Sequence, residues 1–217
     1  NDVDFKFEHG EIEINTERGN HEIEIAHSAE VQADMQGAYL STYKVAGEEK
    51  RMLTTQFESH YAREAFPCVD EPEAKARFTI IITSDDAKDI ILSNMPVEDE
   101  QIVGESKRVR FMQTPPMSSY LVAFIASELV SYETKSQHGV KITAYATPAQ
   151  NVSDLKIGGD FAADVLDYYD DLFKVPYPLP KLDLVAIPDF DAGAMENWGL
   201  MTFREVAMLA NEKSSTE

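Results

Sequence analysis

The spacing of apolar residues changes once along this chain, close to Pro148. Before this point, short runs such as Glu11–Ile14 and residues 22–25 alternate polar and apolar positions, which is typical of strands with one buried face. After it, apolar residues between 155 and 173 recur mostly at intervals of three and four, which predicts one helix of about five turns. The chain is therefore predicted to place a β-rich part before a part that combines helix and strand.

The β-rich part is predicted to continue to about residue 146, with Gly-centred turns between its early strands. Its later candidate strands lie at residues 78–82, 90–92, 120–126 and 140–145. We predict a mainly β domain for residues 1–146, an antiparallel sandwich or a saddle-like sheet, and a second domain for residues 147–217. The second domain has only about 70 residues and no obvious closed core, so we expect it to be incomplete.

A continuous apolar run at residues 182–187 is predicted to form a buried strand. Soon after it, residues 193–197 have the sequence Gly-Ala-Met-Glu-Asn. The small residues Gly193 and Ala194 leave the backbone open to the close approach of another extended chain. Glu196 follows at the end of this edge, where its carboxylate could hold the charged amino terminus of a peptide.

A second candidate carboxylate lies in the strand-like segment at residues 55–58, which has the sequence Thr-Gln-Phe-Glu. Because side chains alternate across a strand, Gln56 and Glu58 point to the same side. An α-ammonium group offers three donors, and nearby carboxylates make charge-assisted hydrogen bonds that an acylated terminus cannot make. Taken by itself, Glu58 is better explained as an exposed carboxylate on a strand.

Four segments, in order along the chain, resemble sequence blocks of the M1 family of zinc aminopeptidases. They are residues 62–78, similar to the block A-R-x-A-F-P-C-F-D-E-P-x-x-K-A-x-F; residues 114–124, similar to a segment near the end of the first domain; residues 177–188, similar to the lead-in to the exopeptidase motif; and residues 193–197, which match the G-A-M-E-N exopeptidase motif itself. Val69 replaces the usual Phe, a modest change of packing volume. The resemblance covers most of the chain from about Gly37 onward.

The resemblance implies a saddle-like, antiparallel N-terminal domain followed by the α+β beginning of a thermolysin-like catalytic domain. It also implies that two segments bind the amino end of the substrate. Their residues would be Gln56, Glu58, Gly193, Ala194, Met195, Glu196 and Asn197.

The resemblance further implies that the complete enzyme holds a zinc ion through two His and one Glu, with the glutamate of an H-E-x-x-H helix as general base. That motif is absent from these 217 residues, and the five histidines show no ligand spacing. We therefore expect the zinc ligands and the general base after Glu217. We expect this chain by itself to bind no zinc and to be inactive.

Several other residues of the matching blocks are expected to have structural roles. Arg63, Asp70 and Glu71 could form a partly buried ion network. Cys68 is expected to be a small buried hydrophobic side chain, because it is the only cysteine and no suitably placed histidine accompanies it. Trp198 is expected to pack behind the Glu196 site.

The chain carries 19 Lys and Arg against 39 Asp and Glu, for a formal net charge of −20. Such a surface repels phosphate backbones and anionic lipids, so neither a nucleic acid nor a membrane is expected as a partner. The expected partners are peptides with a free amino terminus, together with the rest of the catalytic domain and the C-terminal domains. The single cysteine and the lack of a signal peptide or membrane span favour a cytoplasmic location.

These observations favour a fragment of a zinc metallo-aminopeptidase that removes amino-terminal residues from peptides. Two alternatives stay open. One is a non-catalytic scaffold that keeps the fold for protein contacts, and the other is a zinc enzyme that hydrolyses epoxides, as one branch of the family does. The Gly-Ala-Met-Glu-Asn form of the motif favours the aminopeptidase over the epoxide hydrolase. The presence or absence of H-E-x-x-H in the native gene downstream would separate the aminopeptidase from the scaffold.

Overall fold

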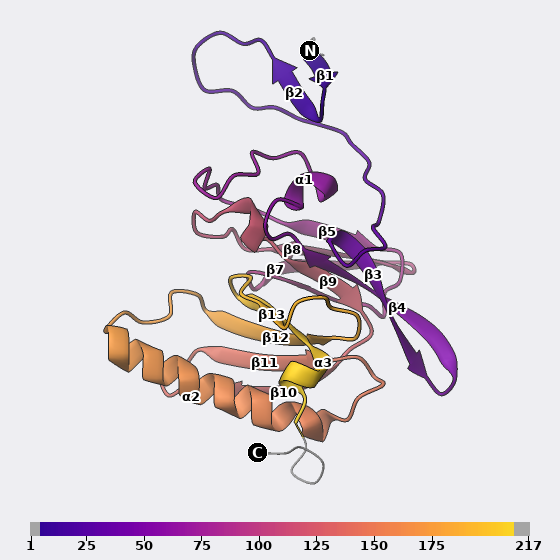
Figure 1. Ribbon diagram of the computed structural model, residues 1–217, viewed down its shortest axis with the longest axis vertical. Coiled ribbons are helices and arrows are strands. Elements are labelled where there is room, and N and C mark those ends of the chain that lie inside the picture. The colour runs from indigo at the N-terminus through magenta and orange to yellow at the C-terminus, as the bar shows by residue number, and fades with distance from the viewer. Residues whose placement is uncertain (1–4, 211–217) are drawn as a thin grey trace.

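The computed structural model describes residues 5–210, so both outer ends of the two predicted domains lie outside the described residues. Figure 1 shows a β-hairpin at one end of the long axis, antiparallel sheets in the middle, and a sheet covered by a long helix at the other end. The hairpin consists of β1 (Phe5–Glu8) and β2 (Glu11–Ile14), which pair antiparallel.

The middle of the molecule contains two antiparallel sheets. The first has the order β3-β4-β9-β6 and consists of β3 (Gly37–Val45), β4 (Glu48–Gln56), β9 (Phe124–Ser127) and β6 (Ile90–Ser93). The second has the order β5-β8-β7 and consists of β5 (Ile81–Ser84), β8 (Ser106–Phe111) and β7 (Val97–Val103). Two short helical segments, α1 (Ala62–Ala65) and η1 (Ser119–Leu121), lie between strands. The predicted mainly antiparallel β fold is confirmed.

Three of the predicted strands are wrong in whole or in part, and one of them is the run at 78–82, because β5 begins only at Ile81. Residues 22–25 alternate polar and apolar positions, but they are exposed and pair with no strand among the described residues, so their apolar side chains cover no sheet. The run at 120–126 starts with η1 instead, and β9 begins only at Phe124. The Ser119 hydroxyl donates to Asp70 Oδ1 at 2.6 Å, and this contact holds the chain in a turn before the strand.

The sheet at the far end is mixed, with the order β10-β11-β12-β14-β13. Its strands are β10 (Val130–Lys135), β11 (Lys141–Ala146), β12 (Lys181–Ile187), β14 (Leu200–Arg204) and β13 (Ala194–Met195). The three central strands run parallel, and both edge strands run antiparallel to their neighbours. Every residue of β12 is buried, which confirms the predicted buried strand. The predicted domain boundary at 146 falls at the end of β11, so residues on both sides of it share this sheet.

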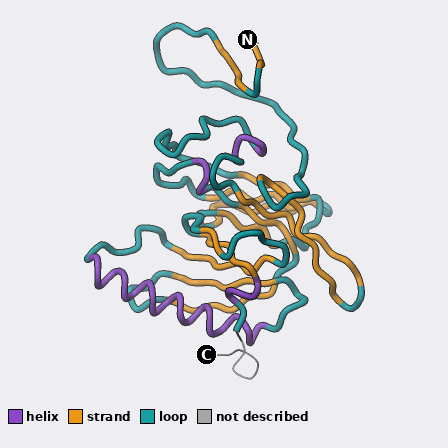
Figure 2. The backbone as a smooth tube through the Cα atoms, viewed as in Figure 1, coloured by secondary structure: helices purple, strands orange, loops and turns teal. Residues whose placement is uncertain are grey.

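The predicted long helix is present as α2 (Lys156–Phe173), preceded by a 3-10 turn, η2 (Val152–Leu155). It ends at Lys174, whose φ of 54° is left-handed, two residues before Pro176. The helix lies along one face of the mixed sheet (Figures 1 and 2). It approaches closely at Gly159, where an added Cβ would lie 3.0 Å from a ring carbon of Tyr132. A last short helix, α3 (Glu205–Met208), follows β14, and none of the helices in residues 5–210 combines the length and apolar character needed to cross a membrane.

One core cluster joins the antiparallel part to the mixed sheet. It contains Tyr39 and Met52 from β3 and β4 together with Val185 and Leu200 from β12 and β14, all of them at most 1% exposed. Because these side chains share one core, the mixed sheet and the β3–β4 sheet are held in a fixed arrangement. That arrangement positions the segment between β12 and β14.

Candidate active-site segment

The segment between β12 and β14 is tied to its surroundings at its start and near its middle. At its start, Asp189 is bound to β3: the Thr42 N–H donates to Asp189 Oδ2 at 2.8 Å, and the Asp189 N–H donates to Ser41 Oγ at 2.9 Å. Near its middle, the Gly193 carbonyl accepts a hydrogen bond from the N–H of Arg204, the last residue of β14, at 3.0 Å. These contacts hold the predicted site residues in a defined position on the sheet.

Strand β13 forms the outer edge of the mixed sheet. Ala194 and Met195 pair with β14 on one side, and no strand among residues 5–210 pairs with their other side. An added Cβ at Gly193 would meet no atom within 4 Å, so the backbone is open here, as predicted. The Met195 side chain is buried in the core, so Met195 can offer only its backbone to a ligand at this edge.

A tight turn after β13 carries Glu196, whose side chain is exposed. Asn197 is buried, and its Nδ2 donates to Thr202 Oγ1 at 3.1 Å. Gly199 follows with a φ of +84°, and a Cβ at this position would lie 2.2 Å from the carbonyl oxygen of Asn94. The turn therefore presents an exposed carboxylate, and its backbone is fixed by the buried contacts of Asn197 and Gly199.

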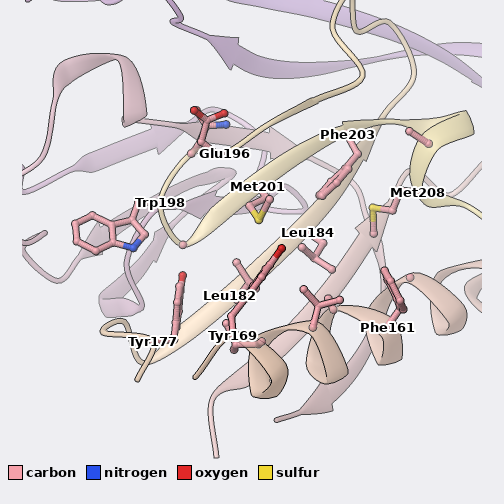
Figure 3. Close-up of a pocket in the computed structure, with 17 residues that line it drawn as sticks. Phe161, Tyr169, Tyr177, Leu182, Leu184, Glu196, Trp198, Met201, Phe203 and Met208 are labelled. Carbon is pink, nitrogen blue, oxygen red and sulfur yellow. The ribbon is translucent and has the colours of Figure 1, made fainter. Parts of the chain in front are cut away.

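A cavity of about 500 Å³ lies between α2 and the mixed sheet, and the turn with Glu196 forms one end of it. Figure 3 shows Phe161 and Tyr169 on α2 below β12 and β14, with Glu196 at the opposite rim and its carboxylate directed away from the helix. Among the described residues that line this cavity, Glu196 is the only charged one. The other lining residues are Gly158, Phe161, Ala162, Val165, Leu166, Tyr169, Tyr177, Leu182, Leu184, Asn197, Trp198, Gly199, Met201, Phe203, Ala207 and Met208.

The second predicted segment lies at the end of β4. Glu58 is exposed there, whereas Gln56 is buried and its Oε1 has no hydrogen-bond partner among the described residues. Between them, Phe57 is buried in a hydrophobic cluster against which Trp198 also packs, so the two predicted substrate-binding segments border the same cluster. Neither Gln56 nor Glu58 lines the cavity between α2 and the mixed sheet. The segments are thus neighbours, but the two carboxylates do not share that cavity.

Sequence reasoning did not identify the buried pair formed by Lys181 and Asp183 on β12. Lys181 Nζ donates to Asp183 Oδ2 at 2.6 Å. Burial lowers the pKa of the Lys181 ammonium, and the charge of Asp183 opposes this effect; burial likewise raises the pKa of Asp183 against the influence of Lys181. The sequence does contain a signal for this pair, because two charged residues at alternate positions of an apolar strand lie on the same face.

The predicted ion network at Arg63 is confirmed. Arg63 Nε donates to Asp70 Oδ2 at 3.2 Å, and an oxygen of Glu71 lies 4.0 Å from its Nη2. Nearby, burial raises the pKa of the half-buried Cys68 thiol to about 11, so the thiolate is scarce at neutral pH and a structural role is supported. Within residues 5–210, no three His, Cys, Asp or Glu side chains are grouped so that they could hold a metal ion.

Comparison with known proteins gives two family matches. The family model described as the peptidase M1 N-terminal domain matches residues 3–121, and the one described as the peptidase family M1 domain matches residues 159–217.

Relatives from bacteria, animals and plants are similar to most of the chain. Aminopeptidase N of Lactococcus lactis subsp. cremoris (strain MG1363) is 43% identical over 201 residues, which cover 92% of this chain and 23% of that protein. Endoplasmic reticulum aminopeptidase 1 of Rattus norvegicus is 45% identical over 195 residues, covering 88% of this chain and 21% of that protein. Aminopeptidase M1-C of Oryza sativa subsp. japonica is 46% identical over 182 residues, covering 84% and 20%. The chain thus spans less than a quarter of the length of these relatives.

Proposed function

Because this chain belongs to the peptidase M1 family, we propose that it supplies the substrate-recognition part of a zinc-dependent aminopeptidase. In this proposal the longer protein removes amino-terminal residues from peptides, and the present chain recognises the free amino terminus. The aminopeptidase names of the relatives support the activity. Their greater length is the reason for assigning the remaining machinery to residues outside this chain.

The observation that carries the proposal is an exposed carboxylate at the end of an open strand edge. Glu196 directly follows β13, whose outer edge has no strand partner in the described part of the chain. A peptide in an extended conformation can hydrogen-bond along such an edge. Its α-ammonium group then lies next to Glu196, and carboxylate and ammonium form short, charge-assisted hydrogen bonds.

The backbone around Glu196 suits this task because it is both accessible and fixed. Gly193 and Ala194 are exposed, and they leave room for the peptide backbone. The buried Asn197 side chain fixes the turn through Thr202, so little conformational entropy is lost when a ligand binds. Met195 contributes through its backbone, since its side chain belongs to the core.

We assign Glu58 a second contact to the same ammonium group. Trp198 packs against the hydrophobic cluster that contains Phe57, which supports this assignment because the end of β4 and the Glu196 turn border the same cluster. Gln56 can take part only if its side chain turns outward, since its Oε1 is buried. Two carboxylates at one ammonium group would favour free amino termini over acylated ones, which carry no charge.

We propose that the catalytic zinc ion is held by residues outside this chain. The described residues provide no group of three ligands for it, so they do not fit a zinc site and no catalytic step is assigned to a metal here. The rest of the catalytic domain is the proposed partner for the apolar walls of the cavity between α2 and the mixed sheet. A cytoplasmic location is also proposed, supported by the single cysteine of the chain.

The test is the variant Glu196→Ala in the full-length protein, measured by kcat/KM on peptides with a free amino terminus. Loss of a partner for a desolvated charge is worth roughly 2–4 kcal/mol, so kcat/KM should fall by about 30- to 1000-fold. The same contact aligns the peptide for attack, so kcat should fall as well as KM rise. N-acetylated peptides should be poor substrates of the parent and no worse for the variant.

The matched control is Glu133→Ala. Glu133 is an exposed carboxylate on β10, at the opposite edge of the same sheet, and its ion pair with Lys141 is exposed and of little energetic weight. Its removal should leave kcat/KM unchanged. Wild-type kcat/KM in Glu196→Ala would show that Glu196 is a structural carboxylate and would remove the basis of the proposal.

A further inference from the structure

The backbone just after Glu196 is held by two buried polar side chains from other elements. The first is Asn94, which follows β6. Its Nδ2 donates to the Trp198 carbonyl at 2.9 Å and to the Leu121 carbonyl at 2.8 Å, and its Oδ1 accepts from the Ala123 N–H at 3.0 Å. Asn94 thus joins the Glu196 turn to the segment between η1 and β9.

The second is Lys181, the first residue of β12. Its Nζ donates to the Gly199 carbonyl at 2.8 Å, to the Ser93 carbonyl at 2.7 Å and to Asp183 Oδ2 at 2.6 Å. An ammonium group has three N–H donors, so each donor of Lys181 has an acceptor. One side chain therefore joins the Glu196 turn both to the end of β6 and to β12.

These contacts leave the turn little freedom to move. The Gly199 and Asn94 backbones already touch, since a Cβ at Gly199 would lie 2.2 Å from the Asn94 carbonyl oxygen. Movement towards β6 is therefore blocked, and movement away from it breaks the hydrogen bonds from Lys181 and Asn94. Burying an ammonium group costs free energy that an apolar side chain would not cost. What Lys181 supplies instead is a set of directional contacts.

We infer that Lys181 and Asn94 are positioning residues that fix the turn at 197–199 and thereby fix the carboxylate of Glu196. The inference rests on the proposed function, in which Glu196 contacts the substrate ammonium group. Neither residue needs to touch substrate for this role. A displacement of about 1 Å in a positioned group can lower the rate by about 100-fold, so a looser turn has a measurable effect.

The test is a double-mutant cycle in the full-length protein, with kcat/KM on free-amine peptides as the readout. Lys181→Met should lower kcat/KM by about 10- to 100-fold when Glu196 is present. In a Glu196→Ala background the further loss should be less than about threefold, because the carboxylate that the turn positions is gone. Asn94→Ala should show the same pattern. A merely structural role would produce equal losses in both backgrounds.

The matched control is Lys107→Met. The Lys107 side chain is 12% exposed, against 11% for Lys181, and donates to the Asp89 carbonyl at 2.7 Å, but it lies on β8 and makes no contact with the turn. Its replacement should leave kcat/KM of the folded protein unchanged. If Lys181→Met does not fold, the double variant with Asp183→Asn removes both charges and avoids an unpaired buried carboxylate. The same pattern is expected from it.

Wild-type kcat/KM in the folded Lys181 variants, or equal losses with and without Glu196, would overturn the inference. A Glu196→Ala variant with wild-type kcat/KM is a different result. It would overturn the proposed function, and the positioning role with it.

Discussion

Gly193 and Gly199 lie on either side of Glu196, and they differ in their tolerance for a side chain. At Gly199 the φ of +84° is left-handed, and an added Cβ would collide with the Asn94 carbonyl. At Gly193 the added Cβ would meet no atom within 4 Å, and the residue is not among the glycines with positive φ. Gly199 is therefore required by the fold, whereas Gly193 matters only if a ligand approaches the open edge.

We expect Gly199→Ala to lower the free energy of unfolding by roughly 2–5 kcal/mol, because backbone strain and overpacking add. Gly193→Ala should change it by less than about 1 kcal/mol. In the full-length protein, however, Gly193→Ala should lower kcat/KM, since its methyl group lies where the peptide is proposed to bind. Urea unfolding and peptide kinetics of both variants measure these effects. Equal stability of the two variants would contradict the expectation.

The site residues that could be predicted are those whose role depends on their own chemistry and local spacing. Glu196 and Gly193 belong to a contiguous motif, so the sequence alone was enough to make them candidates. Asn94 was missed because its partners are backbone carbonyls and an N–H group of distant segments, and such contacts leave no pattern in side-chain type. For Lys181, the alternation with Asp183 indicates the ion pair but not the contacts with distant backbone carbonyls. The buried side chain of Met195 was missed for a related reason, since burial depends on neighbours that are far away in the sequence.

Among the secondary-structure elements, helix α2 has more apolar residues than its contact with the sheet can bury. Its exposed large hydrophobic residues, each between 41% and 66% exposed, are Ile157, Phe161, Tyr168, Tyr169, Leu172 and Phe173. A helix that is apolar on two sides is typical of an element covered on both. In the proposed full-length protein, the rest of the catalytic domain covers the apolar residues of α2 that the sheet leaves exposed.

This arrangement gives Phe161 a different role in the chain and in the full-length protein. In the 217-residue chain, where Phe161 is 66% exposed, Phe161→Ala should change the free energy of unfolding by less than about 1 kcal/mol. In the full-length protein it should cost roughly 3–5 kcal/mol, as for a buried aromatic side chain. Ile102→Ala on β7, whose side chain is 58% exposed, is the control and should be neutral in both. An equally small effect of Phe161→Ala in both proteins would show that α2 stays uncovered.

The elements that could be predicted are those with a long, regular pattern. The period of α2 and the continuous apolar run of β12 each extend over enough residues to define the element. Residues 22–25 have the same local alternation as β2, yet within the described part of the chain only β2 pairs with another strand, because local alternation does not encode pairing. The mixed character of the last sheet was also missed, because β10 and β11 look like further antiparallel strands until β12 is known to lie beside β11.

At the scale of the whole molecule, zinc binding is proposed to belong to the longer protein and not to this chain alone. We expect the 217-residue chain, after dialysis against a metal-free buffer, to hold far less than one zinc ion per chain and to leave aminoacyl-anilides uncleaved. The physical reason is that the described residues gather no three ligands, and tight zinc binding needs at least that number from the protein. Elemental analysis and an anilide assay measure both quantities, with the full-length protein as the positive control. One tightly held zinc ion per chain together with turnover would contradict this expectation.

The pairing of β11 with β12 has a consequence for recombination between relatives. The two family matches leave residues 122–158 between them, and both β10 and β11 lie in this interval. A chimaera joined at 146 would place β11 of one parent in a parallel ladder with β12 of the other, where side chains of two lineages must share one register. A chimaera joined at 128–129, between β9 and β10, transfers this ladder whole. The unit that can be exchanged between relatives therefore begins before β10, well upstream of α2.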